Sequence, residues 1–287
     1  MSELFIPRGT HAVDGFDLAA TPAIAGWPYS GLLIKSLAPG ETLQLATADR
    51  EMAVLPLSGS FGVQAGSSSF DLRGRTGVFD AVTDWAYVGI DTDLSITTAS
   101  GGEVALCTAQ ATRSIDPYMV AAEDVQIEVR GGGRGTRQIN NFLSADQHDA
   151  DKLIAVEVLT PDGGWSSYPP HKHDEFSDDE VELEEIYYFK IEGDKGIGMF
   201  SLYTSDHEIN ETWTVRDGDT VLVPKGFHGP AAATPGHHMY YLNVMAGPSE
   251  PRAWRFCDDP DHTWARGMLD AQEPDPRLPL TTAAGRT

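Results

Sequence analysis

The residues best suited to chemistry are three histidines and one glutamate in the second half of the chain. His171 and His173 form a His-Lys-His triplet, Glu185 opens an aromatic run, and His228 follows the segment 223–227. Alternate side chains of an extended strand share a face, so a His-x-His pair can point two imidazoles the same way. A glutamate and a third imidazole on neighbouring strands can then complete a metal site. Such ligands suit Zn, Mn, Fe, Ni or Co, whereas Ca and Mg prefer oxygen. The pattern predicts one divalent transition metal.

These side chains need strands to position them, and the composition favours strands. Short runs rich in Val, Ile, Leu and Tyr recur between turn signals, as at 154–159 and 220–224, and the chain has 29 glycines and 18 prolines. That pattern is typical of β-structure. With 287 residues the chain exceeds a typical single domain, which favours two units of roughly 100 to 150 residues. We therefore expect an all-β protein with two units.

Two intervals recur in the same order in both halves. The spacing from Glu to Gly in Glu51–Gly59 is repeated in Glu185–Gly193, and the spacing in Gly74–Asp84 is repeated in Gly218–His228. Recurrent spacing is the signature of a duplicated unit, here a duplicated β-barrel.

This alignment separates the chemistry of the two halves. Leu37 and Pro39 fall where the paired histidines stand, and Asp84 falls at the position of His228. The first half would keep Glu51 but no imidazole, so we expect it to bind no metal. The glycine-rich segment 131–135 is the expected join. The predicted segments are therefore a metal-free barrel over 1–130, a metal-binding barrel over 131–270 and an extended tail over 271–287.

Charge and cysteine content restrict the partners. The formal net charge is −23, from 43 acidic and 20 basic residues, which would repel nucleic acid and anionic lipid. Cys107 and Cys257 are too few for a disulfide framework in a chain of this size. No signal peptide or membrane-spanning run is recognisable. We expect a cytoplasmic protein that acts on a small molecule; the oligomeric state is left open.

Longer strings resemble the cupin superfamily and, within it, the 5-deoxy-glucuronate isomerase family of bacterial myo-inositol catabolism. The matching segments are Trp165–Asp174, Glu184–Phe189, Val223–Pro230 and Tyr240–Gly247. The resemblance implies two tandem cupin barrels, a bicupin, with the metal site in the C-terminal barrel. It also implies an aldose-ketose isomerase that converts the uronate 5-deoxy-D-glucuronate to 2-deoxy-5-keto-D-gluconate. The family's ligand positions correspond to His171, His173, Glu185 and His228.

The catalytic groups are less sharply indicated than the ligands. Adjacent strand residues face opposite sides, so only one of Glu184 and Glu185 can face the metal, and the resemblance assigns Glu185. Tyr187 shares the face of Glu185. A metal-assisted enediol mechanism needs a group that carries the proton between carbons. The sequence leaves three candidates for it: a metal-bound water, Glu184 and a tyrosine phenol, either Tyr187 or Tyr241. Lys172 is expected to point out of the barrel into solvent.

A uronate also needs a partner for its carboxylate. Arg137 is the candidate clamp because a guanidinium binds a carboxylate through two parallel hydrogen bonds, and a structural salt bridge is the alternative. Lys225 and Arg255 are weaker candidates. Asn243 shares a face with Tyr241 and is a candidate substrate contact. Two rival functions remain, a cupin metal-dependent dioxygenase and a non-enzymatic sugar-acid binding protein.

Overall fold

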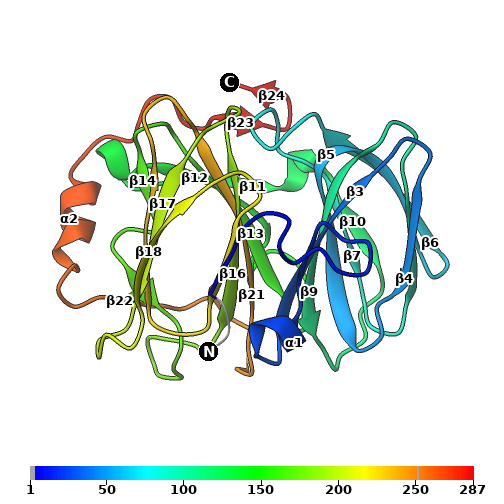
Figure 1. Ribbon diagram of the computed structural model, residues 1–287, viewed down its shortest axis with the longest axis horizontal. Helices are drawn as coiled ribbons and strands as arrows, with labels where there is room; N and C mark the ends of the chain where they lie inside the picture. The colour runs from blue at the N-terminus through cyan, green and yellow to red at the C-terminus, as the bar shows by residue number, and fades with distance from the viewer. Residues whose placement is uncertain (1–3, 251) are drawn as a thin grey trace.

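Two β-barrels lie side by side in the computed structural model, the first half of the chain on the right of Figure 1 and the second half on the left. The structure describes residues 4–250 and 252–287. Within these ranges the helical segments are short: α1 (Pro22–Ala25), α2 (Trp264–Asp270) and the 3₁₀ turns η1 (Ala122–Asp124) and η2 (Gly133–Gly135). Nearly all other regular structure is β-strand, which confirms the expected all-β class.

The first barrel is built on one nine-stranded antiparallel sheet. Its main path runs β10-β7-β5-β9-β3-β2, while β8 joins β5 to β4, and β6 pairs with β5. The long strand β5 belongs to both sides of the barrel, because its first half pairs with β7 and β9 and its second half with β6 and β8. The strands are β2 (Leu18–Ala20), β3 (Ser30–Leu37), β4 (Thr42–Ala46), β5 (Arg50–Ala65), β6 (Ser68–Arg75), β7 (Trp85–Val88), β8 (Asp93–Thr97), β9 (Gly102–Gln110) and β10 (Tyr118–Val120).

The second barrel consists of two facing sheets. One has the order β1-β19-β16-β21-β13-β12-β11, and the other runs β18-β17-β20-β15-β22 with β14 paired to β20. The strands are β1 (Phe5–Ile6), β11 (Gln126–Arg130), β12 (Arg137–Leu143), β13 (Ile154–Thr160), β14 (Trp165–Ser166), β15 (His171–Lys172), β16 (Glu184–Ile191), β17 (Gly198–Tyr203), β18 (Asn210–Val215), β19 (Thr220–Val223), β20 (Phe227–Ala233), β21 (Met239–Ala246) and β22 (Cys257–Asp258).

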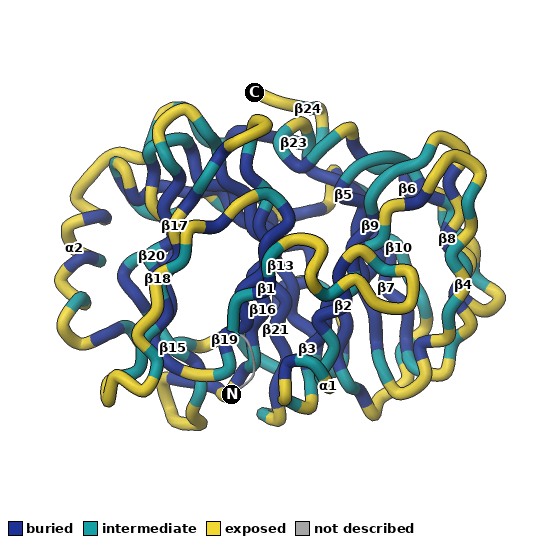
Figure 2. The backbone as a smooth tube through the Cα atoms, viewed as in Figure 1, coloured by how far each residue is buried: buried dark blue, intermediate teal, exposed yellow. Residues whose placement is uncertain are grey.

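Each barrel has its own apolar interior, and a third apolar cluster lies between the barrels. Along β16, Tyr187 and Phe189 belong to the interior cluster of the second barrel, whereas Ile186 and Tyr188 belong to the cluster shared with the first barrel. This strand is buried on both faces, which explains its nearly continuous hydrophobic sequence. The dark tube where the barrels meet in Figure 2 shows the same burial.

Strand pairing crosses the expected segment boundaries. Near the N-terminus, β1 pairs with β19 of the second barrel, with Phe5 opposite Val221. Because β11 pairs with β12, the glycine-rich segment 131–135 is a turn inside the second barrel instead of the join. The C-terminal segment forms a hairpin of β23 (Thr281–Thr282) and β24 (Gly285–Arg286). Thr282 accepts the backbone N–H of Val82 at 3.1 Å, so this hairpin contacts the first barrel.

Each barrel supplies one glutamate that accepts backbone hydrogen bonds from the other barrel. Glu51 on β5 accepts the backbone N–H groups of Lys152 (2.6 Å) and Leu153 (2.7 Å), just before β13. Glu184 on β16 accepts the backbone N–H groups of Tyr29 (2.9 Å) and Ser30 (2.7 Å), where β3 begins. The two contacts are equivalent, which identifies β5 with β16 and Glu51 with Glu184.

This equivalence corrects the sequence alignment, which paired Glu51 with Glu185. On β5 the next residue, Met52, points into the first barrel and pairs with Val88, as Glu185 pairs with Val223 in the second barrel. The alignment was wrong by one residue, so the first barrel does not keep the inward glutamate.

The histidine positions are corrected in the same way. Strands β4 and β8 place Leu45 opposite Leu94, as β15 and β20 place His171 opposite His228. Leu37, Pro39 and Asp84 therefore do not occupy the equivalent positions; Asp84 instead accepts the backbone N–H groups of the segment 73–74. The apolar side chains of Leu45, Met52 and Leu94 give the first barrel no ligand set of this kind. Its lack of metal remains a prediction.

Replacing Glu51 by glutamine should weaken the contact between the barrels. The amide nitrogen would face backbone N–H donors, and hydrogen bonds to a charged group contribute about 1.5 to 3 kcal/mol. We expect the free energy of unfolding, measured by urea titration, to fall by about 2 kcal/mol. The exposed Glu211 on β18 provides the control substitution E211Q. Equal unfolding curves for the two variants would contradict a stabilising role for Glu51.

Candidate metal centre

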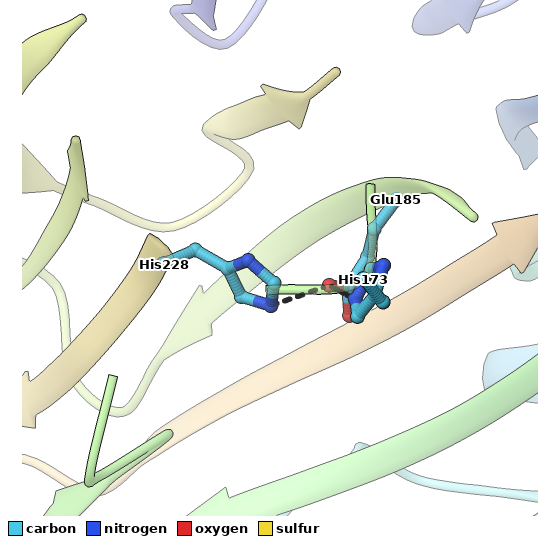
Figure 3. A group of neighbouring side chains, drawn as sticks. All are labelled: His173, Glu185 and His228. Carbon is cyan, nitrogen blue, oxygen red and sulfur yellow. Dashed lines mark hydrogen bonds and ion pairs between the residues drawn. The ribbon is translucent and has the colours of Figure 1, made fainter. Parts of the chain in front are cut away.

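Three of the four predicted ligands meet inside the second barrel. Nε2 of His173 and Nε2 of His228 each lie 3.0 Å from Oε2 of Glu185, and the three ligand atoms lie within 4.8 Å of one another. His173 directly follows β15, Glu185 is the second residue of β16, and His228 is the second residue of β20. All three are buried, with 2%, 1% and 0% of their surface exposed. Figure 3 shows them converging from three separate segments.

Backbone carbonyls fix the orientation of the imidazoles. The Nδ1 atom of His173 lies 3.0 Å from the carbonyl oxygen of Leu183. The Nδ1 atom of His228 lies 3.3 Å from the carbonyl oxygen of Gly226. A carbonyl only accepts, so each Nδ1 donates to its carbonyl and each Nε2 is the ring nitrogen that faces Glu185. Carbonyl partners of this kind are the usual outer contacts of histidine ligands. Nε2 is therefore the nitrogen of each ring that is positioned to bind a metal in place of a proton.

The charge of the cluster also fits a cation. Burial alone would raise the pKa of Glu185, but His228 and His173 hold it well below its usual range, so the carboxylate is ionised. His228 Nε2 is buried and has no hydrogen-bond partner among the described residues, despite its short distance to Glu185. A lone pair that faces a carboxylate oxygen is repelled unless a positive centre lies between them. The donor set therefore fits a divalent transition metal.

His171 lies beside this cluster rather than within it. Its ring centroid is 4.5 Å from that of His228 and 6.4 Å from that of His173. Its Nδ1 lies 3.3 Å from the carbonyl oxygen of Pro169, so its Nε2 is the unprotonated nitrogen. Burial, and then the other two imidazoles, hold the pKa of His171 well below its usual value, which keeps the ring neutral.

The expectation that Lys172 points into solvent was wrong, because its ammonium is paired with carboxylates of the loop that follows it. The Lys172 ammonium donates to Asp174 at 2.7 Å and to Glu180 at 3.0 Å, and only 17% of its side chain is exposed. Glu180 is buried and also accepts the backbone N–H of Asp174. Asp174 in turn accepts the backbone N–H of Gly226, two residues before His228. These contacts hold the loop between β15 and β16 against the segment that carries His228.

A cavity next to the cluster brings together most of the other predicted site residues. Its lining includes Tyr187, Tyr241, Asn243, Arg137 and His171. The cavity thus joins one candidate ligand to both candidate tyrosines and to the substrate-binding candidates Arg137 and Asn243. Asn243 is 3% exposed, and its Nδ2 has no hydrogen-bond partner among the described residues. That buried donor is available to a ligand.

Glu184 lies on the opposite face of β16 and contacts the first barrel. Burial raises its pKa to about 7, a value that would suit a general base, while the backbone N–H groups of Ser30 and Tyr29 oppose the shift. A base must also reach the proton that it removes, and Glu184 does not line the cavity. Its position corrects the expectation of a catalytic role.

Sequence reasoning missed Ser167, which links the two cavity tyrosines. Its hydroxyl lies 3.3 Å from the phenolic oxygens of both Tyr187 and Tyr241. Its backbone has φ 46°, a left-handed conformation that costs about 1 kcal/mol or more outside glycine. Gly229 lies so close that a Cβ there would come within 1.9 Å of the Ser167 carbonyl oxygen. No sequence motif indicates this arrangement, because it depends on a turn held by a distant strand.

Replacing Ser167 by alanine should disturb both phenols without removing either. Each lost hydrogen bond contributes about 0.5 to 1.5 kcal/mol, so we expect turnover to fall roughly tenfold, with a smaller change in KM. The exposed Ser205 provides the control S205A. Steady-state kinetics would check this, and unchanged turnover in S167A would contradict a positioning role.

The remaining basic candidates differ in their surroundings. Arg137 is 7% exposed, donates from Nη1 to the carbonyl oxygen of Gly135 at 3.3 Å, and has no carboxylate within 4.0 Å among the described residues. Lys225 pairs with Glu208 at the surface, and Arg255 donates to the carbonyl oxygen of Asp178. Neither of the latter two lines the cavity. Arg137 is the one of the three that faces it.

Known proteins match this chain over most of its length. Over residues 5–265 the chain matches the KduI/IolB family. A 5-deoxy-glucuronate isomerase of Geobacillus kaustophilus is 40% identical over 267 residues, which cover 92% of this chain and 95% of that protein. The 5-deoxy-glucuronate isomerase of Bacillus subtilis strain 168 is 37% identical over 239 residues, or 82% of this chain and 87% of that protein.

Solved structures show the same fold. An IolB-like protein from Salmonella typhimurium LT2 superimposes with a TM-score of 0.86 at 34% identity, covering 92% of this chain and 99% of the other. Oxalate decarboxylase from Lactobacillus farciminis has a TM-score of 0.64 at 12% identity, with coverage of 90% and 89%, a likeness of fold alone. The expected bicupin fold is confirmed. Because the family match and the similar proteins both cover most of its length, the chain belongs to the KduI/IolB family.

Proposed function

We propose that this protein is a 5-deoxy-glucuronate isomerase, an intramolecular oxidoreductase that converts the aldose 5-deoxy-D-glucuronate to the ketose 2-deoxy-5-keto-D-gluconate in myo-inositol degradation. The observation that carries the proposal is the 40% identity, across 95% of its length, to a protein of that name. The metal-ligand cluster and the adjoining polar cavity supply the chemistry that the reaction needs. The relatives do not favour a dioxygenase or a binding protein without activity.

The metal would be held by His173, Glu185 and His228, with His171 as the fourth ligand. A divalent transition ion in this position would act as a Lewis acid that polarises the substrate carbonyl. The chain's own contribution is to keep the Nε2 atoms of these histidines directed inward and the Glu185 carboxylate ionised. Zn, Mn, Fe, Ni and Co all suit this donor set.

Isomerisation moves a proton between adjacent carbons, and Tyr241 is the better of the two phenols for that task. Burial raises the pKa of both tyrosines. Glu185 raises both values and hydrogen bonds lower both, but Glu185 is the largest cause after burial for Tyr187 and the smallest for Tyr241. The charge of Arg137 further lowers the pKa of Tyr241, so its rise is smaller than that of Tyr187. Tyr241 therefore exchanges a proton more readily, and Tyr187 would hold the substrate beside it.

The other end of the substrate carries a carboxylate. Arg137 would bind it, because the guanidinium faces the cavity without a carboxylate partner of its own. The free Nδ2 group of Asn243 would donate to a substrate hydroxyl or carbonyl oxygen. These two contacts and the metal site would fix the direction in which the substrate lies.

We place this reaction in the cytoplasm. Both cysteines are free thiols, Cys107 buried and Cys257 half-buried, as suits a reducing compartment. No helix in the described residues is long and apolar enough to cross a membrane.

The proposal is tested by incubating the purified protein with 5-deoxy-D-glucuronate and following the keto product by NMR. We expect product formation, loss of it after chelation, and recovery when a divalent transition metal is added back. Oxygen uptake in the same reaction would indicate the dioxygenase alternative. Absence of product with every metal tried would reject the isomerase.

A further inference from the structure

The cavity beside the metal-ligand cluster is too small for a sugar acid. The space that the centre of a water molecule can occupy within it is about 30 Å³. One water molecule needs about 10 to 15 Å³ by this measure, so the cavity holds about two or three waters. A six-carbon sugar acid has about twelve non-hydrogen atoms, each roughly the size of a water. Part of the wall must therefore move before such a ligand can enter.

A larger pocket, here called the outer pocket, adjoins this cavity. It measures about 450 Å³ in the same way, and its lining includes Asn141, Ala145 and Arg252. Arg130 and Trp254 line both spaces, so these two side chains form the wall between them. Displacing either one would join the cavity to a space large enough for a sugar acid.

Of these two side chains, Trp254 is the one that can move at low cost. Arg130 is held by two parallel hydrogen bonds with Glu128, at 2.7 and 2.9 Å, which is the strong form of the guanidinium–carboxylate contact. The Nε1 atom of Trp254 is buried and has no hydrogen-bond partner among the described residues. Turning the indole away therefore breaks no hydrogen bond.

The chain on either side of Trp254 is anchored. Before it, Arg252 donates to the carbonyl oxygen of Leu153 at 2.5 Å. After it, β22 pairs with β15, where Asp258 lies opposite His171. The segment 253–256 between these anchors belongs to no helix or strand. A movement of the wall can therefore stay local, without disturbing the strand that carries His171.

We propose that Trp254 is a movable wall of the substrate site, which turns toward the outer pocket to admit a sugar acid and then closes on it, with Nε1 donating to a ligand oxygen. The inference rests on the proposed function for the size and class of the ligand. A buried N–H without a partner is unfavourable, and a ligand oxygen would satisfy it. Opening would limit the rate of entry, and closure would exclude water from the site.

The test measures how fast two probes bind to the cobalt-loaded full-length protein, by stopped-flow absorbance of the cobalt. D-gluconate is a sugar acid that the enzyme cannot isomerise, and azide needs only the space already present. We expect the observed rate for gluconate to level off at high concentration, because opening becomes limiting, and the rate for azide to rise linearly. A linear rise for gluconate over the same range, or no binding of gluconate, would overturn the proposal.

Variants separate the bulk of the indole from its N–H group. W254A removes the wall, so the plateau in the gluconate rate should disappear. W254F keeps an aromatic ring but loses the donor, so it should keep a plateau and bind gluconate roughly 2- to 10-fold more weakly by isothermal titration calorimetry. Trp264 on α2 is 60% exposed, so W264A and W264F are the matched controls.

Each variant can contradict one half of the proposal. A plateau in W254A equal to that of the unmodified chain would place the wall elsewhere. Equal gluconate affinity in W254F and W264F would show that the indole N–H does not contact the ligand. Thermal melting identifies a W254A protein that has failed to fold, in which case W254L decides.

The outcome is distinguishable from failure of the proposed function. A plateau that W254A abolishes, in a protein that does not convert 5-deoxy-D-glucuronate, would reject the isomerase and keep the movable wall. Conversion of that substrate together with a linear gluconate rate would keep the isomerase and reject the wall.

Discussion

Replacing His173 and His228 together by alanine is expected to remove the bound metal and to lower turnover on the order of 10³-fold or more. Both imidazoles direct Nε2 at the ionised carboxylate of Glu185, and the double variant leaves that carboxylate alone in an apolar interior. The Lewis-acid contribution to such reactions is several kcal/mol, and each 1.4 kcal/mol corresponds to a factor of ten in rate. Elemental analysis and the NMR assay measure the two effects separately.

The same experiment tests whether the first barrel is free of metal. Apolar side chains of Leu45, Met52 and Leu94 stand where the second barrel has ligands, so we expect about one metal ion per chain. The double variant should then contain essentially none. Metal retained at full stoichiometry in that variant would show that another site holds it.

Two further variants distinguish loss of the metal ligands from loss of the folded structure. E185Q keeps the shape of the side chain but removes its charge, so it should lose metal without opening a cavity. H207A alters an exposed histidine in the turn between β17 and β18 and should retain both metal and activity. If E185Q bound metal as tightly as the unmodified protein, the cluster would not be the metal site.

The fold could be predicted from the sequence because short hydrophobic runs and the turn residues between them are local signals. The run at 154–159 lies in β13, and the run at 220–224 covers β19 and the residue after it. The exact correspondence between the two barrels could not be predicted, because it depends on which face of a strand is inward. A shift of one residue reverses every face, which is why Glu51 was aligned with Glu185 when its contacts match those of Glu184.

Some residues of the site could likewise be predicted from the sequence, and others could not. His173, Glu185 and His228 were predictable because ligand chemistry restricts the residue types that can occur there. The roles of Lys172 and Glu180 were not, since an acidic run is usually solvated and only the folded loop buries this pair. Ser167 gave no motif, because its contact with both tyrosines depends on a cavity assembled from distant segments.

The second large effect is expected at Tyr241. Replacing it by phenylalanine removes the phenol that we propose to carry the proton, and loss of general acid–base catalysis lowers rates by roughly 10²- to 10⁴-fold. Tyr187 is the matched control, because its hydroxyl contacts the same Ser167 but lies near the Glu185 charge. Y187F should therefore lower turnover less than Y241F. Equal losses in the two variants would contradict the assignment.

Solvent isotope exchange tests the chemistry that Tyr241 would perform. In an enediol route the proton leaves carbon, resides on the phenol and can exchange with solvent before it returns. Isomerisation in D₂O should therefore place deuterium at the new hydroxymethyl carbon of the keto product, which NMR resolves from the other positions. A direct hydride shift moves hydrogen from carbon to carbon without exchange. The described residues contain one cluster of metal-ligand side chains, whereas a hydride shift generally relies on a second ion to hold the substrate alkoxide. Product that lacks carbon-bound deuterium after many turnovers would therefore reject Tyr241 as an exchangeable carrier.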